Sequence, residues 1–243
     1  MIIIKMGGSI ITNKSRYKSF RSDSCYNIIK SVKSLDTEFI LIHGGGSFGH
    51  IKANKFGLPG KLNKESLLGF SEVHSDMVDL NQRVISILND LEIPSISLPP
   101  AVIYMNGEMS LSAFGYYSRL GFVPVTFGDT YVAGDKIGII SGDELAVRLS
   151  AELSPEKVIF FSDVDGVYDK NPKIHKDARL LRTLSDNATF EITETDVTGG
   201  MRAKVTAAMK IARSGSKVYM INGNFPDRVK ALESSEFIGT VIG

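Results

Sequence analysis

The sequence has few of the features that mark secreted, membrane or nucleic-acid-binding proteins. Its 243 residues contain one cysteine, which excludes an internal disulfide and a cysteine-rich zinc site. No apolar run approaches the length of about 18 residues that suggests a membrane span, and the apolar stretch before Lys5 is too short for a signal peptide. Basic residues total 28 and acidic residues 27, so the basic excess of a dedicated nucleic-acid binder is missing. We therefore expect a cytoplasmic protein without a nucleic-acid or membrane partner.

What is present is the composition of an ordinary globular protein. Hydrophobic residues make up 43% of the chain and charged residues 23%, which excludes wholesale disorder. The length is sufficient to bury a substantial core. Since no linker, repeat or low-complexity segment is visible, we expect residues 1–243 to form a single domain.

Short apolar runs rich in β-branched residues alternate with helical patterns. Strands are expected at 2–6, 39–43, 95–98, 122–127, 157–162 and 217–222, and helices near 22–34, 65–91, 143–153, 200–214 and 226–233. The strand runs are continuously apolar, as in a parallel sheet covered on both faces. Two hairpins are expected, pairing 102–104 with 109–111 around Asn106-Gly107, and 131–133 with 136–140. The predicted fold class is α/β, a mostly parallel central sheet with helices on both faces, plus β-hairpins.

A glycine loop is the most informative segment. Residues 39–50 read FILIHGGGSFGH, so a strand runs straight into four glycines and then into a helix. Glycines let the backbone approach a ligand closely, and a helix N-terminus adds partial positive charge. The loop therefore predicts an anion site, most plausibly for phosphate.

Two other motifs fit the same letters. Gly44, Gly46 and Gly49 match G-x-G-x-x-G, but the acidic residue that a dinucleotide fold places about 20 positions later falls within an expected helix. Gly45, Ser47 and Gly49 match the nucleophile elbow G-x-S-x-G, which would make the protein a serine hydrolase using Ser47. In that reading the oxyanion segment overlaps the elbow itself, which counts against it.

Further glycine turns follow other expected strands. Lys5 precedes Gly7-Gly8-Ser9, Ser141-Gly142-Asp143 opens one helix, and Thr198-Gly199-Gly200-Met201 opens another that carries Lys204. Residues 163–168 read DVDGVY after a further strand. In open α/β sheets ligands bind at the carboxyl ends of the strands. Several glycine turns and lysines at one edge suit a phosphate donor and an anionic acceptor.

Together these motifs resemble the amino acid kinase superfamily, and they follow the family's order from residue 5 to residue 204. Within it, the segment 44–50 is most similar to the isopentenyl phosphate kinase family, because relatives that phosphorylate carboxylates generally lack a histidine at His50. Fosfomycin kinases share that histidine and are the nearest alternative. The resemblance implies transfer of the ATP γ-phosphoryl group to isopentenyl phosphate, giving isopentenyl diphosphate. It also implies a cytoplasmic homodimer with an acceptor part at about 1–150 and a nucleotide part at about 151–243.

The resemblance and the chemistry of phosphoryl transfer assign roles to individual residues. The expected catalytic residues are Lys5, Lys14, His50, Asp143 and Lys204, of which the lysines offset phosphate charge and Asp143 orients them. The expected ATP contacts are Gly7, Gly8, Ser9, Asp163, Asp165, Gly166, Tyr168, Lys170, Gly200 and Lys204. The expected acceptor contacts are Gly45, Gly46, His50 and Gly142, with Phe70, Val73, Met77 and Ile140 around the five-carbon tail. No carboxylate cage is evident, so Mg²⁺ is expected to be held mainly by ATP.

Plainer interpretations stay open for several of these residues. Each lysine could be a solvated surface charge, the apolar helix face at 70–77 could be ordinary core, and Asp143 could simply cap its helix. A catalytically silent phosphate-binding protein on the same fold is a further alternative. His43, His74, His175 and Cys25 are interpreted as structural or surface residues.

Overall fold

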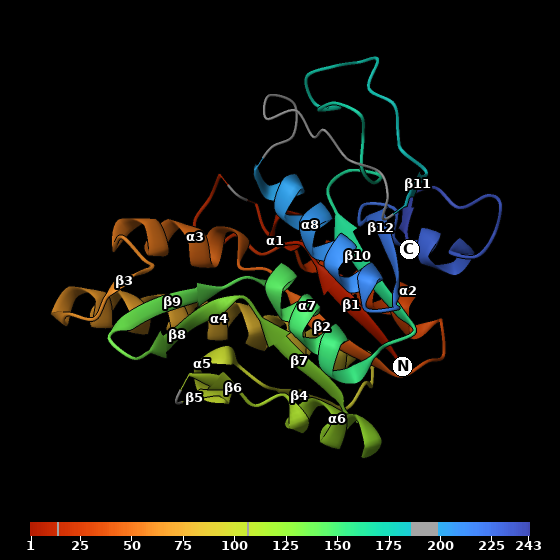
Figure 1. Cartoon of the computed structure of the whole chain (residues 1–243). Helices are drawn as coiled ribbons and strands as arrows, with labels where there is room; N and C mark the ends of the chain where they lie inside the picture. Colours follow the sequence, from red (N-terminus) through yellow and green to blue (C-terminus); the bar gives the residue numbers. More distant parts are fainter. Residues whose placement is uncertain (14, 106, 186–198) are drawn as a thin grey trace.

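A central eight-stranded sheet organises the protein, as the computed structural model in Figure 1 shows. The structure describes residues 1–13, 15–105, 107–185 and 199–243. The strand order is β11-β13-β12-β10-β1-β2-β7-β4. The strands are β1 (Ile2–Met6), β2 (Phe39–His43), β4 (Ser95–Ser97), β7 (Val123–Phe127), β10 (Lys157–Ser162), β11 (Thr183–Leu184), β12 (Lys217–Asn222) and β13 (Thr240–Ile242).

Helices cover both faces of this sheet. They are α1 (Gly8–Ile11), α2 (Ser22–Lys33), α3 (Gly46–Lys55), α4 (Lys64–Asp90), α5 (Pro100–Ile103), α6 (Ser112–Arg119), α7 (Gly142–Leu153) and α8 (Gly199–Arg213), with a 3₁₀ helix η1 (Pro226–Ala231). In β1, Ile4 and Met6 pack into the core beneath α2 and α4, whereas Ile3 packs into the core beneath α7 and α8. Because both faces are covered, every residue of β1 is buried, which explains why the strand is apolar at all its positions except Lys5.

Two smaller sheets lie beside the central one. The first has the order β3-β9-β8, from β3 (Gly60–Lys61), β8 (Asp129–Ala133) and β9 (Lys136–Ile140). The second is a short hairpin of β5 (Tyr104–Met105) and β6 (Glu108–Met109). The β8–β9 hairpin follows the carboxyl end of β7 and lies alongside α4 (Figure 1).

The predicted fold class is confirmed, and the differences have local causes. Pairing is parallel from β4 to β12, but the final strand β13 runs antiparallel to β12. The hairpin expected at 102–111 is shorter than predicted because 100–103 forms helix α5, which has a proline at its first position; its turn residue Asn106 lies outside the described residues. The helix expected at 226–233 is a 3₁₀ helix ending at Ala231.

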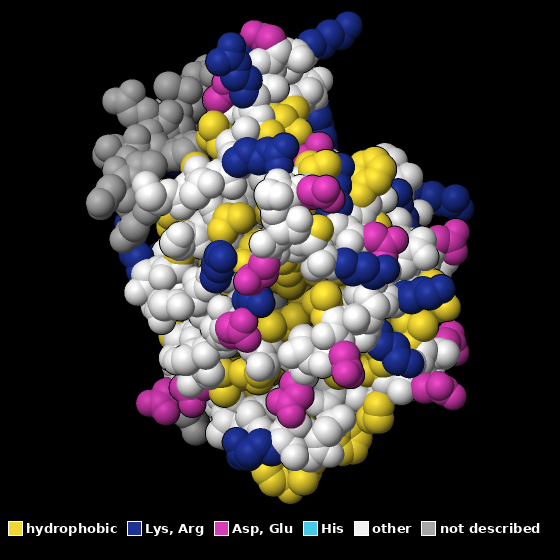
Figure 2. Space-filling model, turned by 90° about the vertical axis from the view of Figure 1, so that its right-hand side faces the viewer, with side chains coloured by type: hydrophobic (Ala, Val, Ile, Leu, Met, Phe, Trp, Pro, Cys, Tyr) yellow, Lys and Arg dark blue, Asp and Glu magenta, His cyan; other side chains and the backbone are white. Residues whose placement is uncertain are grey.

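The surface agrees with the balanced charge of the sequence. Figure 2 shows one face of the molecule, on which basic and acidic side chains are interspersed. Within the described ranges, no helix has the length and apolar character that crossing a bilayer would require.

Candidate active site

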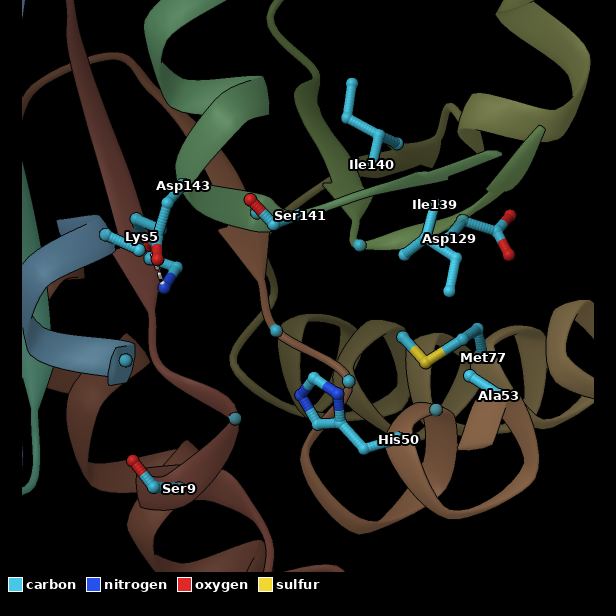
Figure 3. A pocket seen from close by; sticks show the side chains of 18 of the residues that line it. Lys5, Ser9, His50, Ala53, Met77, Asp129, Ile139, Ile140, Ser141 and Asp143 are labelled. Carbon is cyan, nitrogen blue, oxygen red and sulfur yellow. Dashed lines mark ion pairs between the residues drawn. The ribbon is translucent and has the colours of Figure 1, made fainter. Parts of the chain in front are cut away.

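A cavity of about 270 Å³ opens at the carboxyl ends of β1, β2 and β7. Its lining comes from segments far apart in the sequence: Lys5, Gly8, Ser9, Gly44, Gly45, Gly49, His50, Ala53, Val73, Met77, Gly128, Asp129, Ile139, Ile140, Ser141, Gly142, Asp143, Gly200, Ala203 and Lys204. In Figure 3 Lys5, Asp143 and Ser9 lie on one side, Met77, Ala53 and Ile139 lie on the other, and His50 lies between them. The cavity therefore has a polar end and an apolar end.

Two glycine turns meet at the polar end. A Cβ atom on Gly8 would lie 2.7 Å from the Cα of Gly46, and one on Gly44 would lie 2.7 Å from the nitrogen of Gly8. Side chains at these positions would force the turns after β1 and β2 apart. Gly8 and Ser9 occupy the first turn of α1, where backbone N–H groups have no acceptor within the helix. Gly8, Ser9 and Gly44 line the cavity where the two turns meet.

One carboxylate lies between two lysines at the same end. Lys5, on β1 and 3% exposed, forms an ion pair with Asp143 in the first turn of α7. The ammonium nitrogen of Lys204, on α8, lies 3.5 Å from the other oxygen of Asp143. Burial opposes ionisation of this carboxyl, but the charges of Lys5 and Lys204 outweigh burial and hold the pKa of Asp143 below its ordinary value. The cluster carries a net positive charge, as a site for phosphate groups requires.

The apolar end is formed by α4 and the β8–β9 hairpin. Val73 and Met77 lie one helical turn apart on α4, and Ile139 and Ile140 approach from β9. Ala53 of α3 lies beside these side chains, and the carboxylate of Asp129, which also lines this end, points away from His50 and Lys5 in Figure 3. This end suits a short hydrocarbon group.

Three residues with predicted contacts are not among those that line this cavity. The Gly7 N–H donates to the carbonyl of Phe161 at 2.9 Å. Gly46 is buried behind the cavity against the side chain of Thr12, where its φ of +49° requires glycine. Phe70 is not among the lining residues, and its ring stacks on that of His74 with centroids 6.0 Å apart.

Most of the predicted nucleotide contacts lie outside this cavity. Asp165 accepts hydrogen bonds from Asn222 at 3.0 Å and Tyr168 at 3.2 Å, and pairs with Arg228 at 2.5 Å. These groups follow the carboxyl ends of β10 and β12. Burial would raise the pKa of the Asp165 carboxyl, but the hydrogen bonds from Asn222 and Arg228, together with the charge of Arg228, hold the pKa below its ordinary value.

The remaining members of that set are placed individually. Gly166 packs against Thr240 of β13. Lys170 pairs with Asp177, and Asp163 with Lys173, each at 2.5 Å. Of the predicted nucleotide residues, Gly8, Ser9, Gly200 and Lys204 line the cavity. Lys14 and Thr198 lie outside the described residues.

Asp129 is a cavity residue that the sequence analysis did not single out. It begins β8, directly after the strand end of β7, and it accepts a hydrogen bond from the Thr130 N–H at 2.8 Å and pairs with His74 at 2.7 Å. The hydrogen bond between His74 and Asp129 raises the pKa of His74. The position of Asp129 near the carboxyl end of an expected strand could have marked it as a site residue, because ligands of open α/β sheets bind at those ends.

The neighbouring His43 is structural. It is fully buried, stacks on Phe127, and lies 3.2 Å from the amide oxygen of Asn81. Burial lowers the pKa of His43 to about 4, so the ring is neutral at physiological pH.

The geometry argues against a serine hydrolase. Ser47 is 1% exposed, its hydroxyl accepts the Ser19 N–H at 3.3 Å, and it does not line the cavity. A substrate cannot reach that hydroxyl.

Comparison with known proteins agrees with the fold and the site. The amino acid kinase family profile matches residues 1–222, so the chain belongs to the amino acid kinase family. Its full-length relatives include the isopentenyl phosphate kinases of Thermoplasma acidophilum, 41% identical over 100% of both chains, and of Methanothermobacter thermautotrophicus, 35% identical over 100% of this chain and 98% of that one. A crystal structure of the T. acidophilum isopentenyl phosphate kinase in a product complex superposes with a TM-score of 0.92 at 38% identity, covering both chains completely.

Proposed function

We propose that the protein transfers the γ-phosphoryl group of ATP to isopentenyl phosphate, giving isopentenyl diphosphate. The observation that carries this proposal is one cavity with Lys5 and Lys204 at one end, apolar side chains at the other end and His50 between them. A prenyl phosphate has the matching shape, because its charged head and hydrocarbon tail are at opposite ends. The full-length isopentenyl phosphate kinase relatives support the same conclusion.

The acceptor supplies its own nucleophile. A phosphate oxygen of isopentenyl phosphate attacks the γ-phosphorus of ATP, the bond to the bridging oxygen breaks, and ADP leaves. No strong general base is needed for an oxygen that is already ionised, so catalysis consists of positioning and charge stabilisation. At an effective dielectric of about 20, unit charges about 4 Å apart repel by about 4 kcal/mol. The protein must offset several such repulsions between donor and acceptor.

The residues at the polar end are arranged for that task. Lys5 and Lys204 stabilise the transferring group and the donor phosphates, and Asp143 between them keeps both ammonium groups aimed. The N–H groups of Gly8 and Ser9 add donors at the start of α1. Lys14 is proposed to contact the same phosphoryl group.

The acceptor lies across the middle of the cavity. Its phosphate contacts Gly45, accepts a hydrogen bond from His50 and faces Gly142. Its tail extends between Met77, Val73 and Ile140. We further propose that residues 1–150 bind the acceptor and residues 151–243 the nucleotide, with Asp165 and Tyr168 in the nucleotide part.

Mg²⁺ is proposed to enter with ATP. Within the described ranges, no group of three or more histidine, cysteine, aspartate or glutamate side chains could hold a metal ion, and Asp143 is engaged by lysines. The donor set therefore fits an ion that keeps ATP oxygens and water as ligands, where it offsets charge on the donor phosphates. The resemblance also implies a cytoplasmic homodimer, which light scattering of the purified protein would test.

A substrate panel tests the function. Isopentenyl phosphate, fosfomycin, UMP and acetylglutamate are each supplied with Mg-ATP, and ADP release and the product are measured. We expect the highest kcat/KM with isopentenyl phosphate, since its hydrocarbon tail matches the apolar end of the cavity better than the other acceptors do. Preference for fosfomycin would assign the alternative kinase activity. ATP binding without turnover of any acceptor would indicate a catalytically silent protein.

A further inference from the structure

A buried carboxylate on α4 joins three segments near the acceptor end of the cavity. The Asp76 side chain is 3% exposed and accepts a hydrogen bond from the Tyr17 hydroxyl at 2.6 Å. It also pairs with the ammonium groups of Lys18 at 2.8 Å and Lys52 at 3.1 Å. Tyr17 and Lys18 belong to the loop between α1 and α2, whereas Lys52 belongs to α3. One residue therefore holds the loop, α3 and α4 together.

The segments held by Asp76 carry residues that line the cavity. Lys52 lies two positions after His50 on α3, which begins in the glycine loop. Met77, the neighbour of Asp76, has its sulfur 2.9 Å from where a Cβ of Gly45 would lie, and 3.1 Å from that of Gly49. Helices α3 and α4 thus approach closely where the glycines leave room. A shift of α3 along α4 would move His50 and Gly45 together.

The cluster is built so that its members depend on one another. The Tyr17 ring lies 6.0 Å from the Lys18 ammonium and 5.7 Å from that of Lys52, within the range of cation–π attraction. Lys52 also pairs with Glu72 at 3.1 Å. Burial opposes the charge of Lys52, yet hydrogen bonding with Tyr17 and Asp76 keeps the pKa of this lysine above its ordinary value. Removing the central carboxylate would leave two cations and a phenol without their common partner.

We propose that Asp76 is a positioning residue for the acceptor: it holds α3, and with it His50 and Gly45, in the place relative to α4 that the acceptor phosphate needs. The inference rests on the proposed function, because it assigns the acceptor to this end of the cavity. Lys5, Asp143 and Lys204 come from β1, α7 and α8 and are not held by this cluster. In the sequence Lys14, the proposed contact of the transferring phosphoryl group, falls in the loop between α1 and α2. Loss of Asp76 is therefore expected to lower kcat/KM for the acceptor and to leave the KM for ATP unchanged.

The test compares Asp76→Asn with Asp79→Asn. The first change keeps the shape of the side chain and removes its charge. Asp79 lies on the same helix and also pairs with Lys18, at 3.1 Å, but its side chain is 34% exposed. For Asp76→Asn we expect kcat/KM for isopentenyl phosphate to fall at least about tenfold, since small displacements of positioned groups are costly, with the KM for Mg-ATP unchanged within about twofold. For Asp79→Asn we expect both values within about twofold of the original protein.

A second variant distinguishes a loss of positioning from a folding defect in Asp76→Asn. Tyr17→Phe removes only a hydroxyl from a residue that is 44% exposed, and we expect a smaller fall in kcat/KM for the acceptor with normal thermal unfolding. Because both changes break the same cluster, Tyr17→Phe combined with Asp76→Asn should lower kcat/KM no further than Asp76→Asn alone. Additive losses, or a parallel rise in the KM for ATP, would overturn the inference.

Failure of the inference and failure of the proposed function give different results. If the unaltered protein phosphorylates isopentenyl phosphate and Asp76→Asn behaves like Asp79→Asn, the positioning role is wrong and the function stands. If the unaltered protein prefers another acceptor, the proposed function is wrong. The same variants are then measured with that acceptor, and an unchanged kcat/KM overturns the positioning role as well.

Discussion

Replacing Asp143 by asparagine tests the charge arrangement of the site most directly. Lys204 lies 3.5 Å from the Asp143 carboxylate, a separation at which unit charges attract by about 5 kcal/mol at an effective dielectric of about 20. The amide removes this attraction and the ion pair with Lys5, which is 3% exposed and would stay buried without its counter-charge. Breaking a buried pair in this way costs about 3–5 kcal/mol. We expect a loss of that size in the free energy of unfolding.

Turnover should fall as well, because the two lysines would no longer be held toward the phosphates. Loss of a preorganised electrostatic contact costs about 10²–10³ in kcat, and we expect a decrease of that order. The matched control is Glu144→Gln at the next position, whose side chain is 42% exposed and pairs with Arg148 on the same helix. Such exposed pairs contribute about 0.3–0.5 kcal/mol. Urea unfolding and steady-state turnover that do not distinguish the two variants would refute the argument.

The same carboxylate predicts a pH dependence. The pKa of Asp143 is lowered below its ordinary value of 3.8 in the folded protein, so ionisation favours folding. The stabilisation is complete above the ordinary pKa and is lost as the pH falls through the lowered one. The difference in free energy of unfolding between the unaltered protein and Asp143→Asn should therefore shrink as the pH falls below about 4. A difference that stays constant from neutral to strongly acidic pH would show that the charge is not responsible.

Three further predictions concern the acceptor end and its histidines. His50→Ala should lower kcat with isopentenyl phosphate by about 10²-fold, as loss of an oxyanion donor does, without changing the KM for ATP; near-normal turnover would remove His50 from the mechanism. Val73→Ala should raise kcat/KM for longer prenyl phosphates relative to isopentenyl phosphate, since each methylene accommodated is worth about 1–3 kcal/mol, and an unchanged ratio would place the end of the tail elsewhere. In NMR titrations the His43 ring, with a pKa of about 4, should not titrate near neutral pH, and titration there would contradict its buried, neutral state. His74, which pairs with Asp129, should titrate at a higher pH than an ordinary histidine. Asp129→Asn should lower the pKa of His74.

Much of the fold could be predicted from local sequence because the physical cause is local. The strands at 2–6, 39–43, 157–162 and 217–222 occur where they were expected, since a strand covered on both faces is apolar at most of its positions. The reversal at β13 could not be predicted, because three residues carry no periodicity that distinguishes strand direction. The 3₁₀ form of 226–231 was missed for a similar reason: six residues do not separate one helix type from another.

In the candidate site, too, some residues could be predicted from local sequence and others could not. Glycine turns with lysines at strand ends indicated a phosphate site, and Gly8, Gly45, His50 and Lys204 do line one cavity. The apolar helix face did not separate side chains that line the cavity from side chains that pack elsewhere. Phe70 shares that face with Val73, yet its ring stacks on His74 and it is not among the lining residues.

The sequence by itself determined which residue types stand at the strand ends, because backbone conformation and the alternation of buried elements are local properties of the chain. Only the tertiary structure decided which of those ends meet. Asp143 lies between Lys5 and Lys204 because α7 and α8 pack against each other over the face of the sheet to which β1 contributes. Asp76 joins Tyr17 to Lys52 because α3 and the loop after α1 both rest on α4. Contacts between residues so far apart are set by how whole elements pack, and no spacing along the chain records them.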